Sequence, residues 1–428
     1  MADIQKLVTM LKELDDQLVS CMRCGMCQAV CPVFAETGRE ADVTRGKLAL
    51  LDGLAGEILK DPKGVKEQLD RCLLCGTCQA NCPSGVHVMD IFLKARAILT
   101  GYFGLSPAKR IIFKQLLTRP ELFNKLTTFG SKFQGMFAKP VNDVLGTSCA
   151  RFQAPLIADR HFPSLAAKPF HKSTKPMDEP AGKSGVRVAF YPGCMVDKVY
   201  PGVGHAVLKV LKHHGVGVFM PHGQACCGIP ALSSGDRESF EKMVATNADL
   251  FSNADFDYIL TPCATCSATL KEIWPTMVDN ESLKARIGPV ADKVMDVSEF
   301  LVNVLGVEAM EGAAGKKVTY HDPCHLRNSL KVTAQPRTVL QASKNASFVE
   351  LPNAATCCGC GGSFSLHHYE ISKKIGDLKA KTVEDSGAET LATSCPACMM
   401  QIADRLSQRG HSIPVKHVIE VYAESLGS

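Results

Sequence analysis

The stretch CMRCGMCQAVCP, residues 21–32, returns as CLLCGTCQANCP at residues 72–83. Both follow the pattern C-x2-C-x2-C-x3-C-P, which wraps one loop around a [4Fe-4S] cluster. In domains with two such clusters, the cysteine before proline binds the other cluster. We therefore expect one cubane cluster on Cys21, Cys24, Cys27 and Cys82, and a second on Cys72, Cys75, Cys78 and Cys31.

Two glycines lie inside these loops, Gly25 and Gly76, where a missing Cβ lets the backbone approach a cluster. The alternative for the eight cysteines is zinc, which also takes four thiolates in closed tetrahedral sites. Zinc sites usually combine separate C-x2-C pairs, whereas two intact runs ending in Cys-Pro are typical of ferredoxins. Iron-sulfur clusters are therefore the favoured interpretation.

A different cysteine pattern also occurs twice: a single Cys, then Cys-Cys-Gly, then C-x2-C. The copies are offset by 130 to 132 residues and comprise Cys194, Cys226, Cys227, Cys263 and Cys266, then Cys324, Cys357, Cys358, Cys395 and Cys398. Successive side chains in extended backbone point opposite ways, so adjacent cysteines share one site only where the chain bends. Gly228 and Gly359 permit that bend. A cluster with several irons can use both thiolates, while zinc or a redox dithiol remains the alternative.

The sequence predicts a multidomain protein. Residues 1–100 hold the two ferredoxin-type runs and helical segments, which predicts an α-helical ferredoxin domain with two [4Fe-4S] clusters. Residues 101–185 are broken by prolines and are expected to form a helical connector and linker. Residues 186–312 and 313–428 are tandem repeats of alternating strands and helices, which predict two α/β Rossmann-like domains with parallel sheets. Each cysteine group would lie at the carboxyl ends of the strands, where such sheets bind ligands.

Composition restricts the function classes. The net charge of +5 over 428 residues, without aromatic RNA-binding motifs, gives little support for nucleic-acid binding. No apolar run of about 18 residues predicts a membrane span, and the first twenty residues do not resemble a signal peptide. We expect a cytoplasmic protein, where thiols stay reduced and clustered cysteines favour metals over disulfides.

The connector contains an unusual basic segment. Residues 102–139 carry six phenylalanines and seven lysines or arginines against a single acidic residue, Glu121. Such helices can lie on an anionic membrane, which would place the protein peripherally on the cytoplasmic face of the inner membrane. The alternative, which we favour, is a helical brace packed against the cluster domains or a partner.

Four further residues stand near these patterns. Cys360 and Cys149 fall outside them, and we expect small buried thiols rather than accessory ligands. His321 and His325 flank Cys324, where imidazoles could deliver protons to a quinone or a disulfide, although core or surface histidines are the more common case.

The motifs resemble those of known redox families. The N-terminal part, with Arg45-Gly46-Lys47 and Asp70-Arg71-Cys72, resembles the iron-sulfur subunit of glycolate oxidase and of respiratory D-lactate dehydrogenases. The long spacer between the runs is similar to the helical ferredoxin domain of fumarate reductases. The Cys-Cys-Gly repeats resemble the catalytic domain of heterodisulfide reductase, found also in anaerobic glycerol-3-phosphate dehydrogenase. This resemblance implies one or two non-cubane [4Fe-4S] clusters at the repeats.

The resemblance also implies a function. Because the chain has no flavin or nicotinamide fingerprint, FAD is expected only in a partner subunit that oxidises lactate or glycolate. This chain would pass the electrons toward a quinone or a redox protein, and would not oxidise substrate alone. The alternatives are a heterodisulfide reductase-type subunit that reduces a disulfide at a non-cubane cluster, and a zinc-stapled scaffold.

Overall fold

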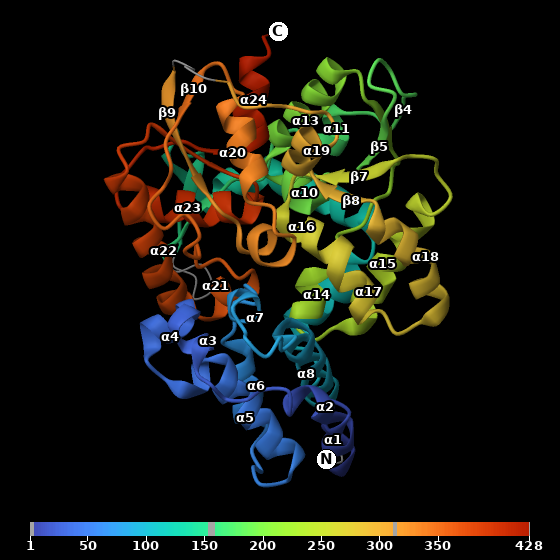
Figure 1. The fold of residues 1–428 in the computed structure, drawn as a ribbon, viewed down its shortest axis with the longest axis vertical. Helices are drawn as coiled ribbons and strands as arrows, with labels where there is room; N and C mark the ends of the chain where they lie inside the picture. The colour runs from blue at the N-terminus through green and yellow to red at the C-terminus, as the bar shows by residue number, and fades with distance from the viewer. Residues whose placement is uncertain (1–3, 153–158, 311–314, 428) are drawn as a thin grey trace.

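The computed structural model describes residues 4–152, 159–310 and 315–427. The chain begins in a helical part at one end of the molecule, and two α/β units with a connector make up the rest (Figure 1). None of the helices in these ranges combines the length and apolar composition that a bilayer crossing needs. The predicted boundary between the repeats, at residues 312/313, lies outside the described residues.

The first hundred residues are helical, as the ferredoxin-type spacing predicts. The elements are α1 (Ile4–Lys12), α2 (Asp15–Leu18), α3 (Met26–Val30), α4 (Pro32–Thr37), η1 (Glu40–Asp42), α5 (Thr44–Ala55), α6 (Pro62–Asp70), α7 (Thr77–Ala80) and α8 (Val88–Phe103). Leu51 on α5 and Ile91 and Leu93 on α8 are fully buried in their shared core. These helices leave the two cysteine runs as loops between them.

The connector is partly helical and partly a small sheet. It contains α9 (Pro107–Ile111), η2 (Ile112–Leu117), α10 (Pro120–Phe137), β1 (Ala138–Asn142), β2 (Thr147–Ala150), β3 (His161–Pro163), α11 (Phe170–Ser173) and β4 (Met177–Asp178). Strands β1, β2 and β3 pair antiparallel, and Thr147 and Ser407 hydroxyls hydrogen-bond at 2.8 Å to join this sheet to the second repeat. We expected a linker after the helices, so the sheet corrects that expectation.

Each repeat contains a sheet of the same strand order. The first sheet is β4-β6-β5-β7-β8, with β5 (Arg187–Phe190), β6 (Gly217–Met220), β7 (Tyr258–Thr261) and β8 (Val294–Asp296). The second is β10-β9-β11-β12, with β9 (Lys316–His321), β10 (Ala346–Phe348), β11 (Thr390–Thr393) and β12 (Val415–His417). All neighbours are parallel except β4, which comes from the connector. The parallel pairing agrees with the alternation of strands and helices in the sequence.

Helices cover both sheets. The first repeat has α12 (Gly193–Lys198), α13 (Pro201–His214), α14 (Ile229–Ser233), α15 (Arg237–Phe251), α16 (Ala264–Ala268), η3 (Thr269–Ile273), α17 (Trp274–Met277), α18 (Glu281–Asp292) and α19 (Val297–Asn303). The second has η4 (His325–Ser329), α20 (Ala334–Gln341), α21 (Ser363–His367), α22 (Tyr369–Asp385), α23 (Pro396–Gln408) and α24 (Val418–Ser425). The repeats pack together through α13 against α24 and α19 against α20.

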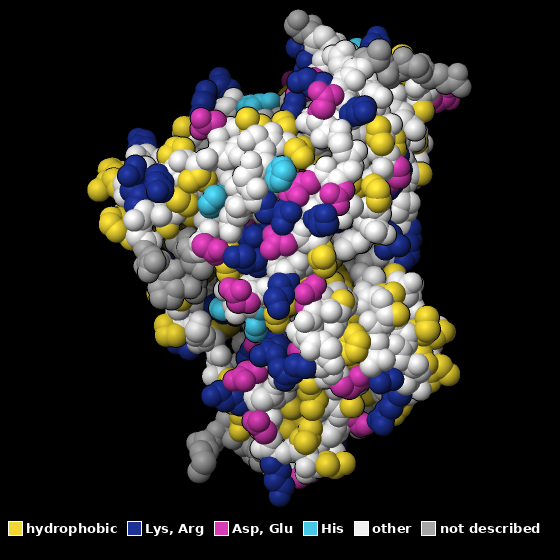
Figure 2. Space-filling view, turned by 90° about the vertical axis from the view of Figure 1, so that its left-hand side faces the viewer, with side chains coloured by type: hydrophobic (Ala, Val, Ile, Leu, Met, Phe, Trp, Pro, Cys, Tyr) yellow, Lys and Arg dark blue, Asp and Glu magenta, His cyan; other side chains and the backbone are white. Residues whose placement is uncertain are grey.

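The face drawn in Figure 2 has no large patch of positive or of negative side chains. Acidic and basic side chains are interspersed over its middle. This mixture agrees with the small net charge of +5.

Candidate metal centres

Five cysteines line a cavity in the outer half of the helical part, and four of them belong to one predicted ligand set. These four are Cys21, Cys24 and Cys27 from the first run and Cys82 from the second. Gly25 caps α3 with a left-handed φ of 88°, which turns the loop around the cavity. The structure therefore gathers the four residues that the crossed ferredoxin pattern groups together.

The other four cysteines line a second cavity, which lies deeper in the molecule. Cys72, Cys75 and Cys78 come from the second run and Cys31 from the first. Cys78 also lines the outer cavity, so the two cavities adjoin. Gly76 caps α7 with a φ of 70°, the same left-handed conformation as Gly25.

The thiols of these cavities fit an iron-sulfur cluster. Burial raises the pKa of Cys31 to about 11 and raises the pKa of Cys75 and Cys78 above the ordinary thiol value. Buried thiols become thiolates when they bind metal, because the metal compensates their charge. Soft thiolates in sets of four suit [4Fe-4S] clusters.

The first five-cysteine set gathers at the carboxyl edge of the first sheet. Cys194 opens α12 after β5, and its Sγ lies 4.0 Å from Cys226 Sγ. Cys263 follows β7 at the start of α16, and Cys266 lies within that helix. Cys227 is close enough to Cys266 that a hydrogen bond between them lowers the pKa of Cys227, after the larger effect of Cys226.

Adjacent cysteines share this site because Gly228 follows them with a φ of 92°. A Cβ there would lie 2.6 Å from a ring carbon of Phe240, so only glycine fits both the conformation and the space. Gly359 plays the same part in the second repeat, with a φ of 86° and the Ser372 carbonyl 2.6 Å from the position of a Cβ.

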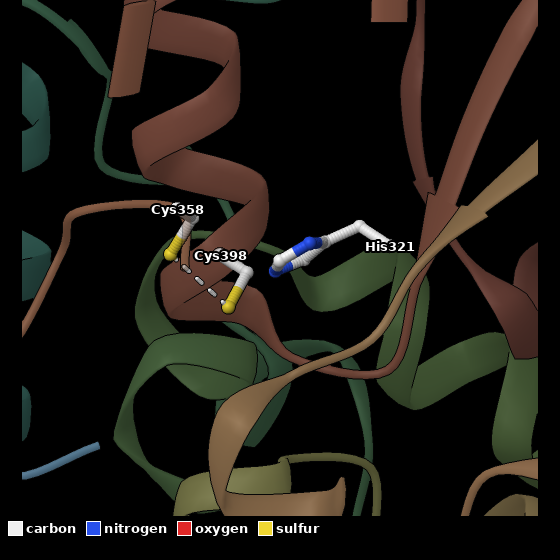
Figure 3. Close-up of side chains that lie close together, drawn as sticks. All are labelled: His321, Cys358 and Cys398. Carbon is white, nitrogen blue, oxygen red and sulfur yellow. Dashed lines mark hydrogen bonds between the residues drawn. The ribbon is translucent and has the colours of Figure 1, made fainter. Parts of the chain in front are cut away.

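The second five-cysteine set repeats the arrangement around β9 and β11. Cys358 Sγ and Cys398 Sγ lie 3.5 Å apart (Figure 3). Cys395 begins α23, and hydrogen bonds from Cys263 and Cys398 lower its pKa well below the ordinary value. Burial raises the pKa of Cys324. The pKa of Cys357 is raised by its hydrogen bond with Cys358 and by burial, and the nearby Cys324 raises it further.

The four groups form a series. Cys75 of the inner cavity raises the pKa of Cys324, after burial, so the second five-cysteine set adjoins that cavity. Cys395 of this set hydrogen-bonds Cys263 of the first set, and Ala264 N donates to Ser394 O at 3.1 Å beside them. The order is thus outer cavity, inner cavity, second set and first set.

Two side chains join the inner cavity to the repeats. His325 Nδ1 lies 3.1 Å from Thr265 Oγ1 and its Nε2 lies 3.0 Å from the Leu74 carbonyl oxygen. Asn328 Nδ2 donates to the Cys75 carbonyl at 2.8 Å. His325 therefore lies between three of the groups, and its ring nitrogens already have protein partners.

The remaining predicted residues lie in different surroundings. His321 is buried beside Cys358 and Cys398, and Figure 3 shows its ring directed toward their sulfur atoms. Cys360 is buried, as expected, and burial raises the pKa of its thiol. Cys149 lies on β2 and is only partly buried.

Sequence reasoning missed Lys47, whose 1% exposed side chain lines the inner cavity. Its Nζ donates to the Ala41 carbonyl at 3.1 Å, and burial lowers its pKa despite the nearby Cys72. Its place in Arg45-Gly46-Lys47 was visible, but a lysine in an amphipathic helix gives no sign of being enclosed.

The cysteine groups coincide with two known family patterns. Residues 17–86 match the 4Fe-4S dicluster domain, and residues 188–271 and 318–403 each match the cysteine-rich domain. The chain is 30% identical to the probable glycolate oxidase iron-sulfur subunit of Bacillus subtilis, over 96% of this chain and 95% of that protein. The chain belongs to the glycolate oxidase iron-sulfur subunit family.

The chain is also similar to proteins that carry other names. Lactate utilization protein A of Shouchella clausii is 35% identical over 55% of this chain and 98% of its own length. A subunit of the CoM/CoB fumarate reductase of Methanothermobacter marburgensis is 29% identical over 95% of this chain and 72% of its own. A hypothetical protein from Helicobacter pylori has a similar fold, with a TM-score of 0.51 and 9% identity, over 100% of this chain and 77% of that structure.

Proposed function

We propose that this chain is the iron-sulfur electron-transfer subunit of a flavin-dependent lactate or glycolate dehydrogenase, and that it passes electrons toward a quinone. The observation that carries the proposal is the continuous series of four cysteine groups through the interior. The family supports a hydroxy-acid oxidase system, because its named relatives are iron-sulfur subunits and lactate utilization proteins.

The ligand sets follow the four groups. We assign two [4Fe-4S] cubanes to the two ferredoxin-type cavities, and one non-cubane [4Fe-4S] cluster to each five-cysteine set. When bound, these clusters supply one-electron oxidation and reduction over a wide range of potentials. The protein holds their thiolates in order, buries most of those in the five-cysteine sets, and places His325 and Asn328 between neighbouring groups.

We assign the electron entry to the outer cavity. Cys24 is exposed, and three apolar side chains around it, Val19, Met22 and Met26, are 51% to 78% exposed. Exposed apolar side chains that gather beside a redox site are typical of protein docking surfaces. The FAD-containing subunit would dock there, with its cofactor next to the first cluster in the series.

We assign the electron exit to a cavity of about 80 Å³ beside the first five-cysteine set. Cys194 and Cys226 line it, together with apolar side chains that include Phe123 and Phe170. One water needs roughly 10–15 Å³ of such space, so the cavity is large enough for part of an organic molecule. It lies at the opposite end of the series from the exposed Cys24.

The polar end of this cavity favours a neutral ligand. His171 Nδ1 lies 2.8 Å from Asp197 Oδ1, and Lys198 forms an ion pair with the same carboxylate. The hydrogen bond with His171 and the charge of Lys198 lower the pKa of Asp197, against the effect of burial. Because Asp197 already neutralises the charge of Lys198, a carboxylate ligand would gain little binding energy there. A quinone carbonyl, in contrast, can accept a hydrogen bond from His171 Nε2, which has no partner among the described residues.

Quinone reduction at this cavity requires protons as well as electrons. Reduction to the quinol takes two electrons, which the flavin subunit supplies through this chain, and two protons. Water supplies both protons, and His171 can relay one of them to the quinone oxygen through Nε2, while Asp197 keeps the ring oriented through Nδ1.

The helix that lines this cavity also presents an apolar surface outward. Five side chains along α10 are between 43% and 64% exposed: Leu126, Phe129, Phe133, Met136 and Phe137. Basic residues Lys125 and Lys132 lie on the same helix. We propose that this stripe contacts an anionic membrane, where quinones are dissolved. The cytoplasmic face of the inner membrane is the expected location.

The test uses the chain purified anaerobically, in the absence and presence of its flavin subunit. We expect lactate or glycolate to bleach the visible cluster absorbance only when the flavin subunit is present. A short-chain ubiquinone should then restore the absorbance, more slowly in His171→Gln than in His213→Gln, whose residue is exposed on α13. Bleaching without the flavin subunit, or reoxidation by a disulfide with thiol release but not by the quinone, would contradict the proposal.

A further inference from the structure

The imidazole of His321 is enclosed beside the second five-cysteine set. It ends β9 and is 1% exposed, and neither Nδ1 nor Nε2 has a hydrogen-bond partner among the described residues. A buried polar group without a partner destabilises the folded chain. The pKa of Cys358 is lowered mainly by Cys357 and Cys398, and to a smaller extent by His321, so the ring faces this thiolate and could share a bound group with it.

The nearest candidates for a shared partner are two thiols of the second five-cysteine set. A ring nitrogen of His321, Cys358 Sγ and Cys398 Sγ all lie within 4.8 Å of one another. Figure 3 shows the ring directed toward the two sulfur atoms. Imidazole together with thiolates is a common donor set for iron and zinc.

The first repeat differs at the equivalent position, where Tyr191 replaces the histidine. Charges of Cys227 and Cys266 raise the pKa of Tyr191, after burial, so it faces the counterparts of Cys358 and Cys398. The Tyr191 hydroxyl donates to the Ala225 carbonyl at 2.7 Å and is therefore satisfied by protein. The two repeats thus provide the same five cysteines but differ in the side chain beside them, which is Tyr191 in the first repeat and His321 in the second.

We propose that His321 is a nitrogen ligand of the second five-cysteine site, whereas the first site is held by thiolates alone. The inference rests on the proposed cluster at the second site. A histidine ligand in addition to the five thiolates would give the second cluster a ligand set that the first lacks, so the two otherwise duplicated sites would differ in potential. His321 would then be a ligand rather than the proton donor that the sequence suggested.

Pulsed electron-nuclear double resonance on protein labelled with ¹⁵N-histidine tests this ligand. Anaerobic samples of the full chain are measured both oxidised and reduced with dithionite, with iron and sulfide determined on the same samples. We expect a strongly coupled histidine nitrogen in the wild type and in His213→Gln, and its loss in His321→Tyr, which copies the first repeat.

A second variant covers the case in which tyrosine prevents folding. His321→Cys keeps a donor at the position, so it should retain iron but lose the nitrogen coupling. Full iron loading without nitrogen coupling in the wild type, or coupling that persists in both variants, would overturn the ligand and leave the proposed function intact. Iron missing from the second five-cysteine site, or zinc in its place, would overturn the cluster assignment as well.

Discussion

At the scale of single residues, Lys47 shows how a side chain outside the cysteine patterns can set the properties of a centre. Its ammonium group lies in the lining of the inner cavity, where the charges of Cys72 and Cys31 partly offset the effect of burial on its pKa. A buried cation stabilises the reduced, more negative form of a neighbouring cluster. Water screens the charge of an exposed lysine much more strongly than that of a buried one, so an exposed lysine affects a cluster less.

We expect Lys47→Met to lower the midpoint potential of one cubane by tens of millivolts, since one nearby positive charge is removed. Lys60→Met is the matched control, because Lys60 is exposed in the same helical part and should shift no potential. Potentiometric titration followed by electron paramagnetic resonance measures both. An unchanged set of potentials in Lys47→Met would show that the ammonium does not act on a cluster.

The grouping of the cysteines could be predicted at this scale, because each set follows a fixed local spacing. The crossed positions of Cys31 and Cys82 also follow from the ferredoxin pattern. Lys47, Asn328 and His171 could not be predicted, because their places depend on segments far away in the sequence. Asn328 reaches Cys75 across more than 250 residues, and no local motif marks that contact.

At the scale of elements, each five-cysteine set depends on a strand, a glycine turn and a helix start. Gly228 and Gly359 hold left-handed backbone after the paired cysteines, and Cys263 and Cys395 begin helices directly after strands. Helix starts offer backbone N–H groups that favour negative charge. The repeat therefore suits an anionic centre in both copies.

Gly228→Ala should destabilise the chain by about 1–3 kcal/mol, because it adds backbone strain and a clash with Phe240. The variant should also lose iron from the first five-cysteine site. Gly288→Ala is the control: no heavy atom lies within 4 Å of its added Cβ, and it lies in helix α18. Thermal unfolding and iron analysis compare the two, and equal behaviour would refute a requirement for the left-handed turn.

The repeat strands and helices could be predicted from the alternation of buried apolar runs with helical segments. The sheet of β1, β2 and β3 could not, since its strands are short and partly exposed. It forms because it packs on α23, through contacts such as the His161 N–H to Asp404 at 2.8 Å. Tertiary contacts, not local sequence, stabilise this element.

At the scale of the whole molecule, the helical part is joined to the first repeat through buried polar contacts. Arg96 on α8 donates to the carbonyls of Ser233 at 2.8 Å, Leu69 at 2.6 Å and Cys72 at 2.9 Å. Gly235 lies against the same helix, since its Cβ would lie 2.4 Å from the Arg96 carbonyl oxygen. These contacts fix the inner cavity against the repeats, which the sequence alone did not indicate.

The most direct test of the proposed relay is the iron and acid-labile sulfide content of the full chain, purified anaerobically and combined with stepwise redox titration. We predict about sixteen irons and sixteen sulfides per chain, four for each of four clusters, and four separate one-electron centres. Zinc as the bound metal would contradict the relay. So would about eight irons and eight sulfides, confined to the two ferredoxin-type cavities.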